Sequence, residues 1–149
     1  MRRILLALAL AVALSHAASG ADNTTANPSD GMKIRLKVAD RVITATLIHS
    51  KTTEDFISLL PLTLTMNDLF RREKFGHLPR AISKEGKRTH SYEVGDIAYW
   101  SPGPDVAIYF RQDGQEIPDP GIIVIGKIDS GVETFDVPGS VRVTVEFTK

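Results

Sequence analysis

Apolar and polar residues alternate along most of the chain beyond residue 31. Residues 33–38 place three aliphatic side chains at even positions and three basic ones at odd positions. The same period of two recurs at 43–47, 62–66 and 141–147. This pattern is typical of strands with one buried and one solvated face. Residues 122–128 are almost continuously apolar, which predicts a strand covered on both faces.

Breaks in this alternation predict a hairpin turn and one clear helix. A turn at 40–41 joins the first two strands. After residue 50, Thr52 can cap a helix in which Asp55 supplies the matching acidic residue, and Phe56, Leu59 and Leu60 fall on one face. Pro61 ends that helix.

The remaining strands lie in the middle of the chain. Phe75 and Leu78 indicate a strand ending at Pro79, and the segments 97–100 and 106–110 flank a Ser-Pro-Gly-Pro turn. The total is about eight strands with one or two short helices, so the fold class is mostly β. Many short strands separated by turns favour a sandwich or a closed barrel.

Two longer blocks carry a family resemblance. They are LLPLTLTMNDLFRREKFGHLPRAIS at 59–83 and YEVGDIAYWSPGPDVAIYFR at 92–111. In amino-acid sequence and in their order along the chain they resemble the bacterial cyclophilin-like family of small β-barrels, and the resemblance extends over roughly Met32 to Phe147. The resemblance implies a closed cyclophilin-like β-barrel formed by a single domain, residues 32–149. The function of that family is unsettled, so the resemblance implies an architecture rather than an activity.

The N-terminal residues predict export. Arg2 and Arg3 precede an apolar run at 4–14 and then small residues, the composition of a secretory signal peptide at 1–21. The run is too short to cross a bilayer, so no stable membrane anchor is expected. Residues 22–31 are polar and read as a flexible leader. We therefore expect a periplasmic or secreted bacterial protein; the cleavage position, and Met32 as an internal start, stay open.

Charge and composition exclude several functions. The chain has 18 basic and 18 acidic side chains, so removing Arg2 and Arg3 with the signal leaves a formal charge of −2. A nucleic-acid partner is not expected, because such proteins carry a basic excess on one face. There is no cysteine, hence no thiolate nucleophile and no disulfide. The histidines are isolated along the chain, so neither a metal nor a cofactor is predicted.

Prolyl isomerisation is an alternative activity, because true cyclophilins catalyse it. They hold proline in an apolar pocket while an arginine hydrogen-bonds near the prolyl nitrogen, which eases the loss of amide conjugation. Their motif places phenylalanine five residues after that arginine and glutamine eight residues after it. Here the positions after Arg71 are Gly76 and Pro79, and those after Arg72 are His77 and Arg80. Neither register matches.

One candidate ligand site surrounds the Ser-Pro-Gly-Pro turn. The two flanking strands end in aromatic residues and one cation, namely Tyr99, Trp100, Tyr109, Phe110 and Arg111. Aromatic faces with a few polar groups are typical of small-molecule and peptide sites. The competing interpretation is that alternate members of this set are core and the others ordinary strand surface.

A second candidate site comprises Glu73, His77 and Arg80. On a strand, Glu73, Phe75 and His77 share one face. If that face lies inside the barrel, a buried Glu and His must pair with each other or with Arg80, and such pairing indicates a site. If it faces water, the three residues are ordinary surface.

We therefore expect an exported cyclophilin-like barrel that binds a peptide or a small-molecule ligand without demanding chemistry. The alternatives are a peptidyl-prolyl isomerase with a non-standard active site and a structural or interaction module of the cell envelope. The identity of the ligand and the oligomeric state stay open.

Overall fold

The computed structural model describes residues 31–148. The predicted signal peptide, 1–21, lies outside these residues, as does all of the predicted leader except Gly31. The strands are β1 (Met32–Val38), β2 (Arg41–Leu47), β3 (Leu62–Leu69), β4 (Glu73–His77), β5 (Arg88–Thr89), β6 (Asp96–Trp100), β7 (Asp105–Tyr109), β8 (Ile122–Ile128) and β9 (Val141–Phe147). The helices are α1 (Lys51–Ile57) and the single-turn 3₁₀ helix η1 (Val132–Phe135).

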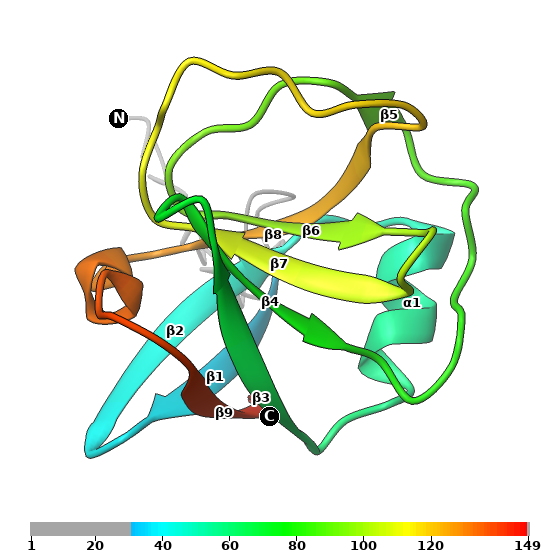
Figure 1. The fold of residues 1–149 in the computed structure, drawn as a ribbon. Coiled ribbons are helices and arrows are strands. Elements are labelled where there is room, and N and C mark those ends of the chain that lie inside the picture. The colour runs from blue at the N-terminus through cyan, green and yellow to red at the C-terminus, as the bar shows by residue number, and fades with distance from the viewer. Residues whose placement is uncertain (1–30, 149) are drawn as a thin grey trace, which may run out of the picture.

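The strands form a closed antiparallel barrel (Figure 1). Their order is β2-β1-β9-β3-β4-β7-β6-β8, and pairing of β2 with β8 completes the ring. The short β5 adds to the outside of this ring by pairing with β8. Closure leaves the eight barrel strands without an unpaired edge. The predicted mostly-β class, the closed barrel and the strand number are confirmed.

The barrel interior is filled by one side of the alternating pattern. In β1 the aliphatic residues at 34, 36 and 38 are buried and the basic residues between them are exposed, as predicted. Phe56 of α1 and Phe135 of η1 enter the same core. Figure 1 shows the two helices on opposite sides of the barrel. Within residues 31–148, no helix is long and apolar enough to cross a membrane.

Three local predictions need correction. Ser50 caps α1, where its Oγ accepts the Thr53 N–H at 3.1 Å. Thr52 is instead fully buried, and its hydroxyl accepts the backbone N–H of Gly86. The strand expected to end at Pro79 ends at His77, and the helix expected to end at Pro61 ends at Ile57. Neither β5 nor η1 was predicted, because neither is long enough to show a period.

One inward position of β4 carries a charge. Lys74 is fully buried, and its Nζ donates to Asp68 Oδ2 at 2.9 Å and to the carbonyls of Val137 and Gly139. The ammonium has three donors, so these three acceptors satisfy it. Lys74 therefore ties β4 to the segment that connects η1 with β9.

A second apolar layer covers part of the outside of the barrel. It lies on the outward faces of β6, β7 and β8 and consists of Tyr92, Ala98, Ala107, Tyr109, Ile117 and Ile122. The β7–β8 connection, the yellow loop at the top of Figure 1, supplies Ile117. Since this layer buries the outer side of β8, the strand is covered on both faces, as its continuous apolar run predicts.

Candidate functional site

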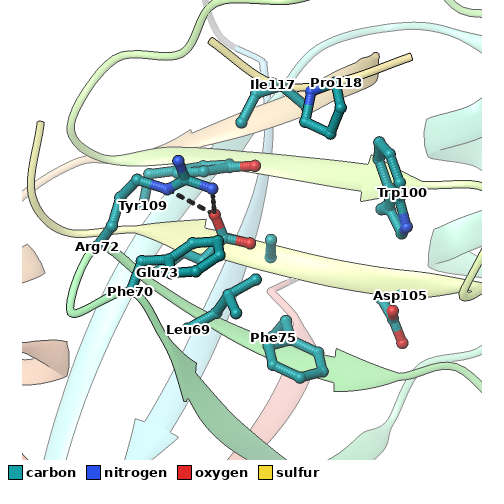
Figure 2. Close-up of a pocket in the computed structure, with 11 residues that line it drawn as sticks. Leu69, Phe70, Arg72, Glu73, Phe75, Trp100, Asp105, Tyr109, Ile117 and Pro118 are labelled. Carbon is teal, nitrogen blue, oxygen red and sulfur yellow. Dashed lines mark hydrogen bonds and ion pairs between the residues drawn. The ribbon is translucent and has the colours of Figure 1, made fainter. Parts of the chain in front are cut away.

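The candidate site lies on the outer face of the barrel, where β4, β7 and β6 are neighbours (Figure 2). Outward positions alternate along each strand, so Glu73, Phe75 and His77 of β4 share this face, as predicted. The register pairs Glu73 with Tyr109 and His77 with Asp105. Trp100 of β6 is paired with Asp105 on the other side.

These residues border an open cleft with a volume of about 200 Å³. Sites for drug-sized molecules measure roughly 300–1,000 Å³, so this cleft has room for a small ligand or a single side chain of a peptide. The walls are formed mainly by Phe70, Phe75, Trp100, Tyr109, Ile117 and Pro118. Ala107 is also part of the lining, and its small side chain leaves room between Phe75 and Trp100. The polar lining consists of Arg72, Glu73 and Asp105.

Glu73 is the buried acidic group of the cleft, with 6% of its surface exposed. Its Oε2 accepts two hydrogen bonds from Arg72, from Nε at 2.9 Å and from Nη2 at 2.6 Å. Figure 2 shows both bonds ending on the same oxygen, while the second carboxylate oxygen points away from Arg72 into the cleft. Arg72 Nη1 also lies 3.5 Å from Asp113 Oδ2 in the β7–β8 connection.

The surroundings of Glu73 shift its protonation equilibrium. Burial raises the pKa of Glu73, and the negative charge of Asp113 adds to this shift. The hydrogen bonds and charge of Arg72, and a weaker contact with the Tyr109 hydroxyl, oppose it only in part. Burial also raises the pKa of Tyr109, and the negative charge of Glu73 adds to that shift. The cleft thus holds a carboxyl group whose ionised form is less favoured than in water.

Aromatic rings surround the guanidinium of Arg72. Its carbon atom Cζ lies 5.3 Å from the ring centroids of both Phe70 and Tyr92 and 5.8 Å from that of Tyr109. Tyr92 and Tyr109 stack with centroids 4.3 Å apart. The hydroxyl of Tyr92 donates to Asp113, which holds the β7–β8 connection against this wall. The polar end of the cleft is therefore rigidly built.

The turn between β3 and β4 presents Phe70 at the rim of the cleft. It is closed by a hydrogen bond from the Arg72 N–H to the Leu69 carbonyl. Its two central residues, Phe70 and Arg71, have φ of 56° and 53°, values that favour glycine or asparagine. Phe70 is 71% exposed. A strained turn that holds an aromatic ring in water is more typical of a binding site than of a structural connection.

The structure brings together only part of the residues predicted from sequence. Glu73, Trp100 and Tyr109 line the cleft, and His77 lies at its edge, where Nδ1 is 3.2 Å from Asp105 Oδ1. The sequence indicated a site only if Glu73 and His77 lay inside the barrel. Glu73 is instead buried on the outside of the barrel, under the outer layer, and pairs with Arg72, whereas His77 is exposed.

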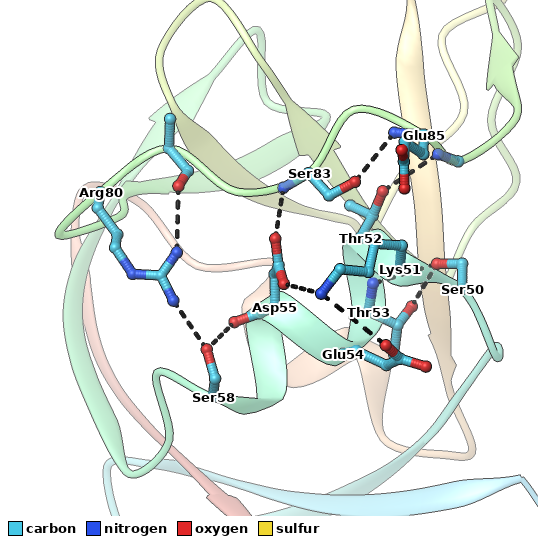
Figure 3. Close-up of polar contacts among 12 residues, drawn as sticks. Ser50, Lys51, Thr52, Thr53, Glu54, Asp55, Ser58, Arg80, Ser83 and Glu85 are labelled. Carbon is cyan, nitrogen blue, oxygen red and sulfur yellow. Dashed lines mark hydrogen bonds and ion pairs between the residues drawn. The ribbon is translucent and has the colours of Figure 1, made fainter.

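The other predicted residues lie elsewhere. Tyr99 points into the barrel core, where its hydroxyl accepts the Ile82 N–H. Arg111 forms an exposed ion pair with Asp136 at 2.7 Å. Arg80 lies near the end of α1 and donates to Ser58 Oγ at 2.8 Å (Figure 3). Arg80 thus stabilises the helix rather than Glu73 or His77.

Several lining residues are not among those predicted from the sequence. Arg72 entered only through the isomerase motif that the chain lacks, Phe70 was not predicted, and Ile117 and Pro118 lie in a connection without periodicity. The available signal was Arg72 directly before an outward Glu73 on a predicted strand. In residues 31–148, no three His, Asp or Glu side chains come together as metal ligands would.

The fold and the cleft define a class of protein, a small closed β-barrel with an aromatic hollow on its outer wall. Residues 36–146 match the model of the cyclophilin-like family, so the chain belongs to that family. A search of curated proteins found no match.

Among solved structures, the chain is similar to the solution structure of a hypothetical protein from Archaeoglobus fulgidus, with a TM-score of 0.65. The two are 23% identical, and the match covers 83% of this chain and 99% of the other. At this identity the similarity shows the fold alone.

Proposed function

We propose that this protein is an exported binding protein whose outer cleft holds a small molecule or a peptide side chain. Export rests on the signal-like residues 1–21. Binding rests on one observation above all: a buried carboxyl group, Glu73, reaches into an aromatic cleft that is open to solvent. A carboxyl group is costly to bury, and a ligand that hydrogen-bonds to it compensates that cost.

Trp100 provides a direct test of this proposal. It is the only tryptophan of the chain and it lines the cleft, so its fluorescence reports occupancy. We expect saturable changes in emission when phenethyl alcohol, phenethylamine or hydrocinnamate is titrated into the protein. If none of these three aromatic probes binds, the cleft is not a small-ligand site.

Paired substitutions separate binding from folding. Trp100→Ala should weaken probe binding at least tenfold, as measured by NMR because the fluorophore is lost. Its free energy of unfolding should change by less than about 2 kcal/mol, because the Trp100 side chain is only half-buried. Its neighbour Tyr99 is fully buried, so Tyr99→Ala should cost about 3–5 kcal/mol. Equal destabilisation by both variants would assign Trp100 to the core and remove its proposed role.

Prolyl isomerisation remains the second candidate because Arg72 lies at one end of an apolar cleft. Its guanidinium already donates to Glu73 and contacts Asp113, so it is less available to a prolyl nitrogen. We expect no acceleration of cis/trans exchange in X-Pro peptides, measured by NMR. Acceleration that is lost in Arg72→Lys, with Arg111→Lys as the control, would establish the enzyme instead.

A further inference from the structure

We propose that the cleft selects a small organic cation, a protonated amine attached to an apolar body. This inference rests on the proposed binding function and names the class of its ligand. It follows from three properties of the cleft: the sign of its charges, the kind of hydrogen-bonding atom that it leaves open, and its aromatic walls.

The charged side chains that line the cleft carry a net negative charge, because two carboxylates face one guanidinium. Glu73 and Asp105 lie toward opposite ends of it, because Asp105 pairs with His77, four residues beyond Glu73 in β4. Four residues of a strand span about 13 Å. Arg72, the cation of the lining, is neutralised by Glu73 at 2.6 Å and by Asp113 at 3.5 Å.

The open polar atom is an acceptor. Both hydrogen bonds from Arg72 end on Oε2 of Glu73, and the other carboxylate oxygen points into the cleft (Figure 2). Glu73 as a whole is more than nine-tenths buried, and this oxygen is the part of its carboxylate that faces the cleft. A protonated amine donates hydrogen bonds and carries the complementary charge, which makes the contact stronger than one between neutral groups.

The rings favour a cation as well. The faces of aromatic rings attract cations, and Arg72 already lies within 6 Å of three ring centroids at the polar end of the cleft. Phe75 and Trp100 extend the aromatic wall beyond Glu73 and are only half-buried. A ligand with an ammonium group at Glu73 therefore places its apolar body against Phe75 and Trp100.

An anionic ligand fits less well. To pair with Arg72 it has to displace Glu73, which already occupies two donors of the guanidinium. It would then also face two carboxylates across an apolar space, where like charges repel strongly. The cleft therefore discriminates by charge in addition to shape.

Three probes with the same aromatic body test this selectivity. Phenethylamine, phenethyl alcohol and hydrocinnamate carry a positive, a neutral and a negative head group. From Trp100 fluorescence at neutral pH and low salt, we expect phenethylamine to bind at least tenfold more tightly than phenethyl alcohol, and hydrocinnamate to bind most weakly. Equal or tighter binding of either other probe overturns the inference but leaves the proposed binding function. Binding of none overturns both.

Substitutions then locate the charge. Glu73→Gln keeps the shape and an acceptor, and should weaken phenethylamine about tenfold to a hundredfold while phenethyl alcohol is little affected, since hydrogen bonds to charged groups are the stronger ones. Glu54→Gln, at an exposed position of α1, is the matched control and should change neither affinity. Should Glu73→Gln fail to fold, the probe series on the unaltered protein still decides. Equal losses for both probes in Glu73→Gln would overturn the role of its charge.

Discussion

At the scale of single residues, the unusual feature is the adjacent pair Arg72 and Glu73, both more than nine-tenths buried on the outside of the barrel. Such pairs add little to stability, because the loss of hydration offsets most of the attraction. Here the balance leaves the pKa of Glu73 raised. The pair is therefore better understood as a means of placing a carboxylate in an apolar cleft than as a means of holding the fold together.

The raised pKa of Glu73 predicts a pH dependence of stability. The folded protein holds the proton more tightly than the unfolded chain, whose glutamate has a pKa of about 4.3. The contribution of Glu73 to stability is therefore complete below that value and is lost as the pH rises through the folded pKa. The difference in free energy of unfolding, unaltered protein minus Glu73→Gln, should therefore decrease as the pH rises from about 4.3 through the folded pKa of Glu73.

Denaturant unfolding of both proteins at a series of pH values checks this sign. Charged or titratable groups near Glu73 are Arg72, Asp113 and Tyr109, and all three are present in both proteins. Their titration therefore largely cancels in the difference. Parallel curves, or a difference that grows as the pH rises, would contradict the assigned shift.

At the scale of elements, the β3–β4 turn combines strain with exposure. Type I′ hairpin turns have positive φ at both central residues and prefer Asn-Gly. Here Phe70 and Arg71 occupy these positions, and the Asp68 carboxylate supports the turn by accepting the Arg71 N–H at 2.9 Å. The sequence of this element opposes its own conformation, which is the situation expected where a side chain is retained for contact with a ligand.

Relieving this strain should stabilise the protein and weaken binding. The double variant Phe70→Asn with Arg71→Gly should raise the free energy of unfolding by about 1–3 kcal/mol, because each non-glycine residue in the left-handed region costs roughly 1–2 kcal/mol and asparagine removes only part of that cost. Phenethylamine should bind less tightly, since the ring of Phe70 is lost from the rim. Denaturant unfolding and fluorescence titration measure the two effects.

Arg71→Gly alone is the matched control for the turn. It removes strain but keeps Phe70, so it should stabilise the protein and leave binding unchanged. A destabilised double variant would show that Phe70 supports the fold, and unchanged binding would remove Phe70 from the site.

At the scale of the whole molecule, the barrel depends on one closing seam. β2 and β8 pair over only three residue pairs, one of which joins Leu47 to Gly126. A Cβ on Gly126 would lie 2.7 Å from the backbone oxygen of Thr46 and from Leu47 Cδ2. No rotamer change relieves a clash with a backbone atom, so glycine at this position permits closure.

Gly126→Ala should therefore cost about 1–3 kcal/mol, the usual penalty of overpacking. Hydrogen exchange should show the loss of protection first in the amides of β2 and β8. The control is Lys127→Ala, which removes an exposed ion pair with Glu93 and a longer contact of 3.8 Å with Asp96, and should cost less than about 1 kcal/mol. A Gly126→Ala protein as stable as the unaltered one would show that the seam tolerates a side chain.

Local sequence pattern predicts most of the strands and which side chains share a face. Alternation placed the inward aliphatic residues of β1 and β2 correctly, and it put Glu73, Phe75 and His77 on one face. It did so because a strand has only two faces, so that period two assigns each side chain to one of them. The family resemblance supplied the barrel, which alternation alone does not distinguish from a sandwich.

What covers those faces depends on contacts between distant parts of the chain. Whether Glu73 is buried depends on the β7–β8 connection folding over β4 and β7, and that connection has no periodicity from which to predict its path. Register likewise set Trp100 beside Asp105 and Tyr109 opposite Glu73, and it sent Tyr99 into the core. Contacts between residues far apart in sequence create the cleft, and local pattern carries little information about such contacts.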